Sequence, residues 1–384
     1  MRSDQQRPPL VRTVAVCIDT RDGAGRKRLY GAAQYGRQHG WLTMLVRYGG
    51  RQAAQEVLRL RPDGILAFFA DRWLLDAARN LNVPLVDTAR GENEVPFLVT
   101  LNSDTVGRLA AEHLLSLGLD CFGYCGVRGM TASEDRRASL ARHLGARGHS
   151  LQAFSQRVAE GESQIAPLMN WLSGLPRPVG VLTFNDALGE RVLTACRWAG
   201  LSVPEQVAVI GVGDDELMCE VSWPPLSSIR FATSRLGYEG ADMLARAMAG
   251  MRIGERVHTV EPTDVIVRAS TDTLATGDPL VRAAVRFIRE HAGEPIGVQH
   301  VATGLDVSRR TLDRRFLARL GRTVHDELAS ARMRVARRLL SEESRSVAEI
   351  AAACGYSTAA SFSRAFQHYV GCWPTDYRNE IRLV

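Results

Sequence analysis

Two arginines recur at the same place in a repeat near the end of the chain. Leu312-x-Arg314-x-Phe316 returns 50 residues later as Phe362-x-Arg364-x-Phe366. Arginine can donate two hydrogen bonds to O6 and N7 of guanine in the major groove, so its return at one helical position suits base reading. The alternative is a basic helix face that is only solvated, and the repeated position argues against it.

The residues around each arginine predict a short helix, a tight turn and a second helix, which is the helix-turn-helix arrangement. Residues 301–308 correspond to residues 351–358, and Ser346 with Glu349 predicts a capping box at the start of the second copy. On each second helix an apolar i, i+4 pair predicts the buried face. We therefore expect the DNA-contacting residues to be Arg309, Arg310, Asp313, Arg314, Ala359, Ala360, Ser361, Ser363 and Arg364. Residues 324–340 predict a helix of roughly 25 Å that joins the two copies.

Polar residues follow several apolar runs in the first 270 residues, where they could bind a polyhydroxylated ligand. Asp19 follows the run 14–18, Asn185 and Asp186 follow 179–184, and Asp214 follows 207–213. Ligands bind outside the carboxyl ends of strands in open α/β sheets, and charged acceptors suit hydroxyl groups. The alternative at each position is a helix N-cap, which Asp and Asn also favour.

Strands alternate with helices of 10–15 residues in this part of the chain, which favours parallel sheets covered on both faces. With eight or more such units over about 260 residues, we expect two α/β lobes. Strands are expected at 14–18, 42–46, 64–69, 84–86, 122–125, 179–183 and 207–212, and helices at 29–39, 53–60, 106–117, 163–174 and 187–199.

The charge distribution separates the two parts. Residues 280–384 carry 17 Arg and 11 Asp or Glu, which accounts for the whole net charge of +6 of the 384-residue chain. A basic module beside a neutral body suggests a polyanion as its partner. No apolar run reaches the roughly 18 residues of a membrane span, and the polar N-terminus lacks a signal-peptide core. Seven scattered cysteines predict no disulfide framework and no metal site, so a reduced, cytoplasmic protein is expected.

Four segments of the body resemble the effector domain of the LacI repressor family. They are residues 185–189 (Asn-Asp-Ala-Leu-Gly), 200–205, 209–215 and 225–229. The resemblance implies the periplasmic sugar-binding-protein fold, two lobes around a cleft, with Asn185 and Asp186 touching sugar hydroxyls. Arg136 stands where that family has an arginine, and Asn102 stands where it often has an aspartate.

This sequence departs from that family at two places. The pattern Gly-x-Asp-[Asn/Asp] becomes Gly211-Val-Gly213-Asp214, so one ligand-facing carboxylate is absent and Asp214 is the candidate to replace it. Where close relatives have Tyr-Gly-Arg, this chain has residues 24–26, Ala-Gly-Arg. The departures concern the identity of the sugar, so xylose or another pentose is a candidate effector only.

The C-terminal module resembles the AraC-family DNA-binding domain, which closes with a G-x-x-P-x-x-Y-R pattern like that of residues 371–378. Residues 268–272 and 278–289 are similar to the junction in xylose-operon activators, which fuse a LacI-like sensor to an AraC-type domain. The expected domains are a ligand-binding domain at 10–272, a linker at 273–279 and a double helix-turn-helix domain at 280–384.

The sequence therefore predicts a sugar-controlled transcription regulator that binds an operator as a homodimer, with RNA polymerase as a further candidate partner. The resemblance implies the dimer. A transport binding protein is the second reading, which the polar N-terminus and the basic module oppose. An enzyme is the third, and the chain lacks a G-x-S-x-G, Walker or H-E-x-x-H motif. We expect no cofactor and no catalytic residue.

Overall fold

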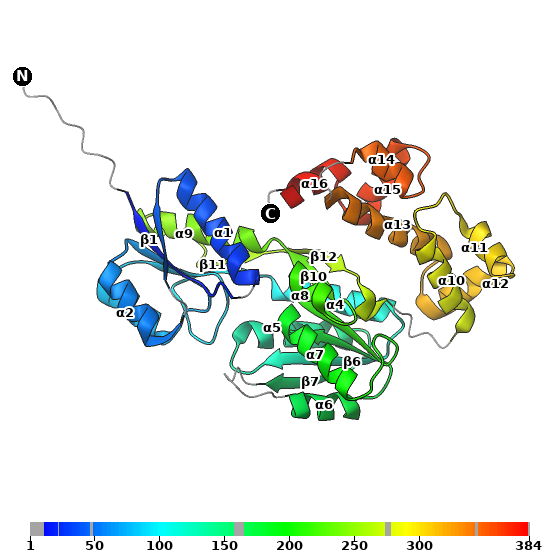
Figure 1. Ribbon diagram of the computed structural model, residues 1–384, viewed down its shortest axis with the longest axis horizontal. Coiled ribbons are helices and arrows are strands. Elements are labelled where there is room, and N and C mark those ends of the chain that lie inside the picture. The colour runs from blue at the N-terminus through cyan, green and yellow to red at the C-terminus, as the bar shows by residue number, and fades with distance from the viewer. Residues whose placement is uncertain are drawn as a thin grey trace, which may run out of the picture.

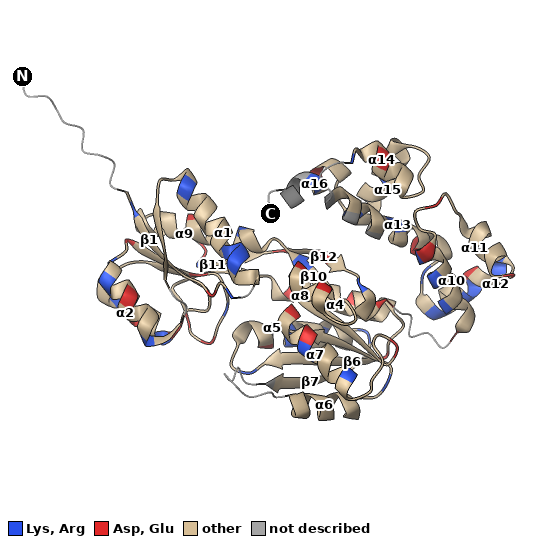
Figure 2. Ribbon diagram, viewed as in Figure 1, with Lys and Arg blue, Asp and Glu red and all other residues tan. Residues whose placement is uncertain are grey.

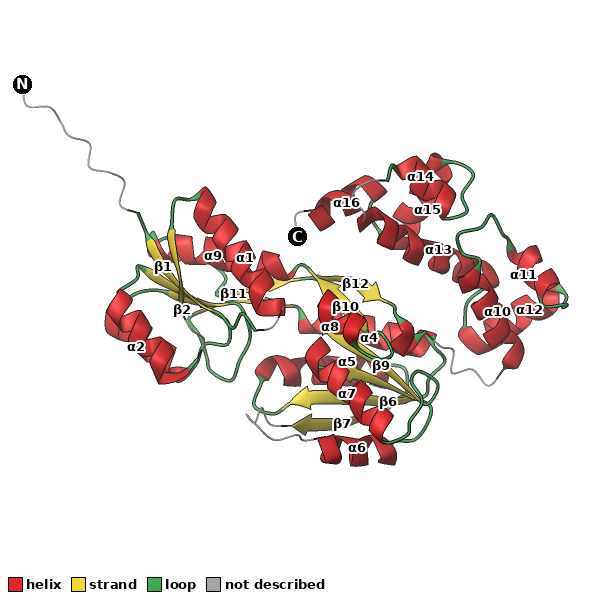
Figure 3. Cartoon of the chain, in the orientation of Figure 1, coloured by secondary structure: helices red, strands yellow, loops and turns green. Residues whose placement is uncertain are grey.

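The computed structural model describes residues 11–21, 23–46, 49–156, 165–272, 278–341 and 345–382. It contains two α/β lobes followed by an all-helical domain (Figures 1 and 3). Among these residues no helix is long and apolar enough to cross a membrane. The two-lobed α/β architecture and the helical C-terminal domain confirm the predicted fold class.

The first lobe, called the N-lobe here, is built on a six-stranded parallel sheet of order β11-β5-β4-β3-β1-β2. Its strands are β1 (Thr13–Cys17), β2 (Leu42–Val46), β3 (Gly64–Ala67), β4 (Leu85–Asp87), β5 (Phe97–Leu101) and β11 (Val257–Val260). Its helices are α1 (Gly23–Gln38), α2 (Gly50–Leu60), α3 (Arg72–Leu81) and α9 (Thr233–Met248). The central strands are buried on both faces because helices cover both sides, as their unbroken apolar runs predict.

The second lobe, called the C-lobe here, has the strand order β12-β10-β9-β8-β6-β7, parallel except for the antiparallel pair β10–β12. Its strands are β6 (Cys121–Val127), β7 (Leu151–Gln156), β8 (Val179–Thr183), β9 (Val207–Gly213), β10 (Ser227–Phe231) and β12 (Pro262–Ile266). Its helices are α4 (Ser103–Ser116), α5 (Thr131–Gly145), α6 (Ile165–Gly174), α7 (Asp186–Trp198), α8 (Glu216–Val221) and the 3-10 turn η1 (Ala269–Thr271).

The chain crosses between the lobes three times, at Asn102, Ala232 and Glu261, which form the hinge. Two of these crossings are bonded to each other. Glu261 accepts a 2.6 Å hydrogen bond from Asn102 Nδ2 and a 2.7 Å bond from Thr105 Oγ1. Two of the three hinge segments are therefore joined by polar contacts just before the start of β12.

The helical domain contains two helix-turn-helix units joined by a long helix. Its helices are α10 (Pro279–Glu290), α11 (Val298–Gly304), α12 (Arg309–Leu320), α13 (Val324–Ser341), α14 (Val347–Ala353), α15 (Ala359–Val370) and α16 (Pro374–Arg382). α10 begins one residue inside the expected linker, because Asp278 caps it and Pro279 suits the first helical position. Most of that linker lies outside the described residues.

The internal repeat extends to the helix caps, again at an offset of 50 residues. Ser308 caps α12 and Thr358 caps α15, while Gly321 and Gly371 end these helices in the left-handed conformation. The predicted capping box is confirmed, because Glu349 N donates to Ser346 Oγ at 3.2 Å and Ser346 N donates to Glu349 Oε2 at 2.7 Å. Each unit has its own apolar core.

Candidate functional site

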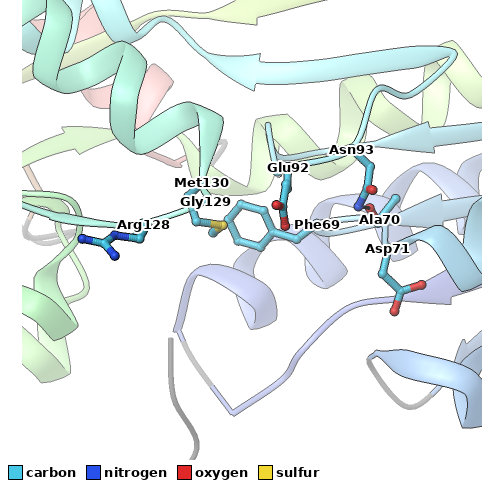
Figure 4. A pocket seen from close by; sticks show the side chains of 9 residues that line it. Phe69, Ala70, Asp71, Glu92, Asn93, Arg128, Gly129 and Met130 are labelled. Atoms are coloured by element: carbon cyan, nitrogen blue, oxygen red, sulfur yellow. Dashed lines mark hydrogen bonds between the residues drawn. The ribbon is translucent and has the colours of Figure 1, made fainter. Parts of the chain in front are cut away.

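A pocket of about 470 Å³ lies between the two lobes (Figure 4). The N-lobe contributes six lining residues and the C-lobe three: Phe69, Ala70, Asp71, Gly91, Glu92, Asn93, Arg128, Gly129 and Met130. Met130 lies against the Phe69 ring, Glu92 lies beside it, and the Arg128 side chain points away. The volume is that of a small-molecule site.

Phe69 has a backbone conformation that aromatic residues rarely adopt, with φ of 60°. A buried carboxylate holds it, because Asp87 accepts hydrogen bonds from the backbone N–H groups of Phe69 (2.9 Å), Ala70 (2.8 Å) and Ala89 (3.1 Å). Burial raises the pKa of Asp87 to about 6, although the hydrogen bonds from these backbone groups act in the opposite direction and lower the pKa. Strain of this kind concentrates at binding sites, and here it presents an aromatic ring to the pocket.

A few polar contacts hold the lobes together beside this pocket. Ala132 N donates to Arg90 O at 3.1 Å, and Arg90 forms a 3.2 Å ion pair with Asp135. Elsewhere in the cleft, Lys27 Nζ donates to Asp214 O at 3.5 Å. Polar contacts of this kind can break and form again when a ligand enters or leaves.

Arg136 and Asp186, both predicted from the sequence, lie close together and buried in the C-lobe. Arg136 Nη1 donates to Phe184 O, and its guanidinium lies 4.7 Å from the centre of the Phe184 ring. Asp186 accepts a 2.5 Å bond from Ser228 Oγ and a 2.8 Å bond from Asp215 N. Burial raises the pKa of Asp186 to about 6 and lowers that of Arg136. Within the described chain, Arg136 Nε has no hydrogen-bond partner, so a buried donor is available here.

Asp214 forms ion pairs inside the C-lobe rather than lining the pocket. Its carboxylate pairs with Arg230 at 2.7 Å and with Arg268 at 2.9 Å, and only 6% of the residue is exposed. The neighbouring glycine explains the sequence departure, because a Cβ atom on Gly213 would lie 2.8 Å from Asp186 Oδ2. Asp186 thus fills the space that a side chain at position 213 would need.

The other three predicted ligand residues lie apart from this cluster or have local partners. Asn185 caps α7 by accepting from Leu188 N, and Asn102 caps α4 at the hinge. Asp19 follows β1 and pairs with Arg21 at 2.8 Å, which lowers the pKa of Asp19. In the part of the chain that the structure describes, none of the six predicted residues is among the residues that line the pocket.

The pocket residues could not be predicted from the sequence, because no local pattern marks them. Phe69, Glu92 and Met130 come from loops whose approach depends on how the lobes meet. The strand expected at 64–69 ends at Ala67 in the structure, so Phe69 lies beyond the strand end, where ligands bind in such sheets. Among the described residues the cysteines form no disulfide, and no group of three metal-ligating side chains occurs there.

The exposed faces of α12 and α15 carry the predicted DNA-contacting residues. Leu312, Phe316, Phe362 and Phe366 are fully buried, as predicted, which turns Arg314 and Arg364 outward. Arg310 and Ala360 are also exposed, Ser361 and Ser363 are half-buried, and Arg309 forms a 3.5 Å ion pair with Asp313. Figure 2 marks the positions of the basic residues on the ribbons of α10 and α12 in blue.

The helix α13 sets the spacing of these two faces. It contains 18 residues and is therefore about 27 Å long. It lies between the two helix-turn-helix units (Figure 1) and packs in the cores of both. A helix of this length can hold the two recognition helices near the roughly 34 Å repeat of successive major grooves.

Comparison with known proteins finds family models that match part of each domain. Residues 111–271 match the periplasmic binding protein-like domain, and residues 301–380 match a helix-turn-helix domain. The xylose operon regulatory protein of Haemophilus influenzae is 28% identical over 336 residues, covering 83% of this chain and 86% of the relative. That of Escherichia coli K12 is 29% identical over 329 residues, covering 83% and 84%.

Solved structures agree on the fold. A xylose-binding transcription activator superposes with a TM-score of 0.59 at 24% identity and covers 96% of this chain and 98% of its own. A periplasmic binding protein/LacI regulator from Alkaliphilus metalliredigens, in complex with D-xylulofuranose, has a TM-score of 0.57 at 18% identity and covers 68% and 100%. The chain resembles the xylose operon regulatory proteins across both domains: it is a DNA-binding transcription regulator with a periplasmic-binding-protein-like sensor domain and a C-terminal AraC-type helix-turn-helix domain.

Proposed function

We propose that a small sugar, with D-xylose as the first candidate, binds between the lobes and controls how α12 and α15 bind operator DNA. The observation that carries this proposal is the interlobe pocket in a chain whose other domain presents two helices with an exposed arginine at the same place in each. A thermal-shift screen of the purified chain with D-xylose, D-xylulose and cellobiose tests it, because a ligand that binds the native state raises its stability. No shift with any sugar would oppose it.

On the sugar side, the pocket offers an aromatic surface, and the buried Arg136–Asp186 pair of the C-lobe offers polar groups. Phe69 supplies the ring, while none of the six tryptophans lines the pocket. Arg136 Nε is a buried donor without a hydrogen-bond partner among the described residues, and Asp186 is a charged acceptor beside it. We propose that closure of the lobes around the sugar brings its hydroxyls to Arg136 and Asp186, with Asp19, Asn102, Asn185 and Asp214 as further ligand residues.

On the DNA side, we propose that the outward faces of α12 and α15 enter successive major grooves on one side of the duplex. Arg314 and Arg364 read bases, and Arg309, Arg310 and Asp313 contribute from α12. Ala359, Ala360, Ser361 and Ser363 form the less basic face of α15. RNA polymerase as a partner and a cytoplasmic location belong to this proposal.

Sugar binding is expected to weaken at acidic pH. The pKa of Asp186 is about 6, so its charged acceptor form falls to about a tenth at pH 5. If the carboxylate accepts from the sugar, the sugar Kd rises about tenfold between pH 7.5 and pH 5. Calorimetry at the two pH values measures this.

The control for this pH dependence is Asp186→Asn, which keeps the shape of the side chain but cannot ionise. Its sugar Kd is expected to be weaker than that of the wild type at pH 7.5 and nearly constant with pH. A wild-type Kd that does not change down to pH 5 would contradict a role for the Asp186 carboxylate.

We also propose a homodimer assembled through the sensor domains. Leu217, Val221 and Trp223 expose 63%, 64% and 73% of their surface at and just after α8, which is a cluster typical of protein interfaces. Trp223→Asp is expected to convert the dimer to a monomer in light scattering at micromolar concentration. Trp198→Asp is the matched control. Trp198 is also exposed, but it is the last residue of α7, whereas α8 follows the carboxyl end of β9. A monomeric wild type would refute the dimer.

A further inference from the structure

The helical domain is held to the C-lobe by a buried carboxylate on the edge strand β12. Asp264 is 6% exposed, and its carboxylate forms a 2.9 Å ion pair with Arg337 Nη1 of α13. It also accepts a 3.3 Å hydrogen bond from the Tyr377 hydroxyl of α16, and Tyr377 is itself buried. Two helices of the second helix-turn-helix unit therefore converge on one side chain of the sensor domain.

A second contact holds the first unit to the same lobe. Arg289 at the end of α10 pairs with Asp272, just after η1. Both contacts lie on the C-lobe, so hinge motion alone carries the helical domain along with that lobe. A signal that reorients the helical domain relative to the C-lobe must pass through the C-lobe to one of these contacts.

Asp264 is placed to receive such a signal from the neighbouring strand. In the antiparallel pair β10–β12, Arg230 lies directly opposite Asp264. The Arg230 Nε atom donates to Asp214 Oδ2 at 2.7 Å on the other side. Arg230 therefore lies between two buried carboxylates, one at the end of β9 and one in the interface with the helical domain.

Asp214 in turn is bonded to the residues of the cleft. Its backbone N–H donates to Ser228 Oγ at 3.0 Å, and the Ser228 hydroxyl donates to Asp186 at 2.5 Å. Its carbonyl accepts from Lys27 of the N-lobe. A ligand that changes the contacts of Asp186, or the approach of the N-lobe, therefore acts directly on the turn that holds Asp214.

We propose that the buried charge chain Asp214–Arg230–Asp264 couples the cleft to the helical domain, with Arg337 and Tyr377 as the receiving residues. Buried charges need their partners, so a shift of Arg230 toward or away from Asp214 changes how firmly Asp264 holds α13 and α16. The second recognition helix, α15, packs against α13 in one apolar core, so α15 moves together with α13. This inference rests on the proposed function, because it names the route by which the sugar acts on DNA.

The test compares DNA affinity with and without sugar in variants of the receiving residues. The full-length chain is titrated, by fluorescence anisotropy, on an operator fragment selected by the wild type, with D-xylose, D-xylulose or cellobiose present or absent. A coupling of about 5- to 150-fold is expected for the wild type. This coupling is the ratio of the DNA Kd values with and without sugar. Arg337→Gln and Tyr377→Phe are expected to bring the ratio at least threefold closer to one, while the sugar Kd of the DNA-free protein changes less than twofold.

The matched control is Tyr238→Phe, which removes a 2.9 Å hydroxyl bond to Gln38 on the N-lobe surface and should keep the wild-type ratio. A wild-type ratio in both Arg337→Gln and Tyr377→Phe would overturn the charge chain while leaving sugar control intact. A wild-type ratio of one with every sugar would instead overturn the proposed function.

A sugar-free cycle keeps the charge chain testable in that second case. Asp214→Asn is expected to change the DNA Kd at least threefold in the wild-type background and less than 1.5-fold, roughly, in the Arg337→Gln background. Equal effects in the two backgrounds would refute the route. Ser228→Ala, which removes the bond between Asp186 and the Asp214 turn, serves as the milder variant if Asp214→Asn does not fold.

Discussion

Arg314→Ala is expected to weaken binding to the specific operator by about 5- to 150-fold. The reason is that a bidentate arginine–guanine contact contributes roughly 1–3 kcal/mol of base discrimination. Arg314 is exposed on α12, and the burial of Leu312 and Phe316 on the opposite side fixes its direction. Anisotropy titrations on the operator, and on a copy with the guanine replaced, measure both the affinity and the discrimination.

Arg364→Ala on α15 should have an effect of the same size, at a base in the second groove. Arg319→Ala is the control for both, because Arg319 is exposed on α12 but lies about 140° around the helix from Arg314. It is expected to reduce affinity for all DNA about equally, or not at all. Folded Arg314→Ala and Arg364→Ala proteins that discriminate the operator as well as the wild type would rule out base reading by these residues.

The helical domain could be predicted from the sequence almost completely, because its signals are local. Ser346 and Glu349 are three residues apart, and the buried pairs at 312/316 and 362/366 follow helical spacing. The repeat then places the second copy from the first. Helix caps and i, i+4 pairs depend on neighbours within one or two turns, so no knowledge of the rest of the chain is needed.

The lobes were predicted as a class, with less success for single elements. α1 begins at Gly23, six residues before the expected start at 29, since the segment 23–28 has glycines and arginines rather than apolar spacing. The edge strands β11 and β12 gave no distinct pattern. Their pairing with β5 and β10 joins residues far apart in the chain, and half-exposed edges do not show a continuous apolar run.

Part of the candidate site could be predicted from the sequence. The rest depends on contacts between residues that are far apart in the chain. Arg136 and Asp186 lie together, but the partners of Asp214 are 16 and 54 residues away, so its two ion pairs could not be read from spacing. Phe69 could not be predicted as a pocket residue, because its φ of 60° depends on the hydrogen bond that its backbone N–H donates to Asp87. Local sequence indicates where polar residues follow strands; the tertiary contacts decide which of them are already paired.

Asp186→Ala is expected to weaken sugar binding at least tenfold. A hydrogen bond to a charged acceptor contributes about 1.5–3 kcal/mol, and the substitution also removes the bonds that Asp186 accepts from Ser228 and Asp215 N. Calorimetry with D-xylose, or with the sugar that gives the largest thermal shift, measures the Kd at pH 7.5. DNA binding without sugar is expected to change no more than it does in Ser228→Ala, because both substitutions break the bond between Asp186 and Ser228 that leads to the Asp214 turn.

Two further variants separate loss of the acceptor from a general effect on the lobe. Asp186→Asn keeps one carbonyl acceptor of the same shape, so its sugar Kd should fall between those of the wild type and Asp186→Ala. Asp120→Ala removes an exposed aspartate just before β6, at the edge of the sheet opposite the cleft, and should leave the sugar Kd unchanged. Because Asp186 is the most deeply buried of the predicted sugar acceptors, an unchanged Kd in Asp186→Ala would place the sugar outside the C-lobe cluster, against Phe69 and the N-lobe side of the pocket alone.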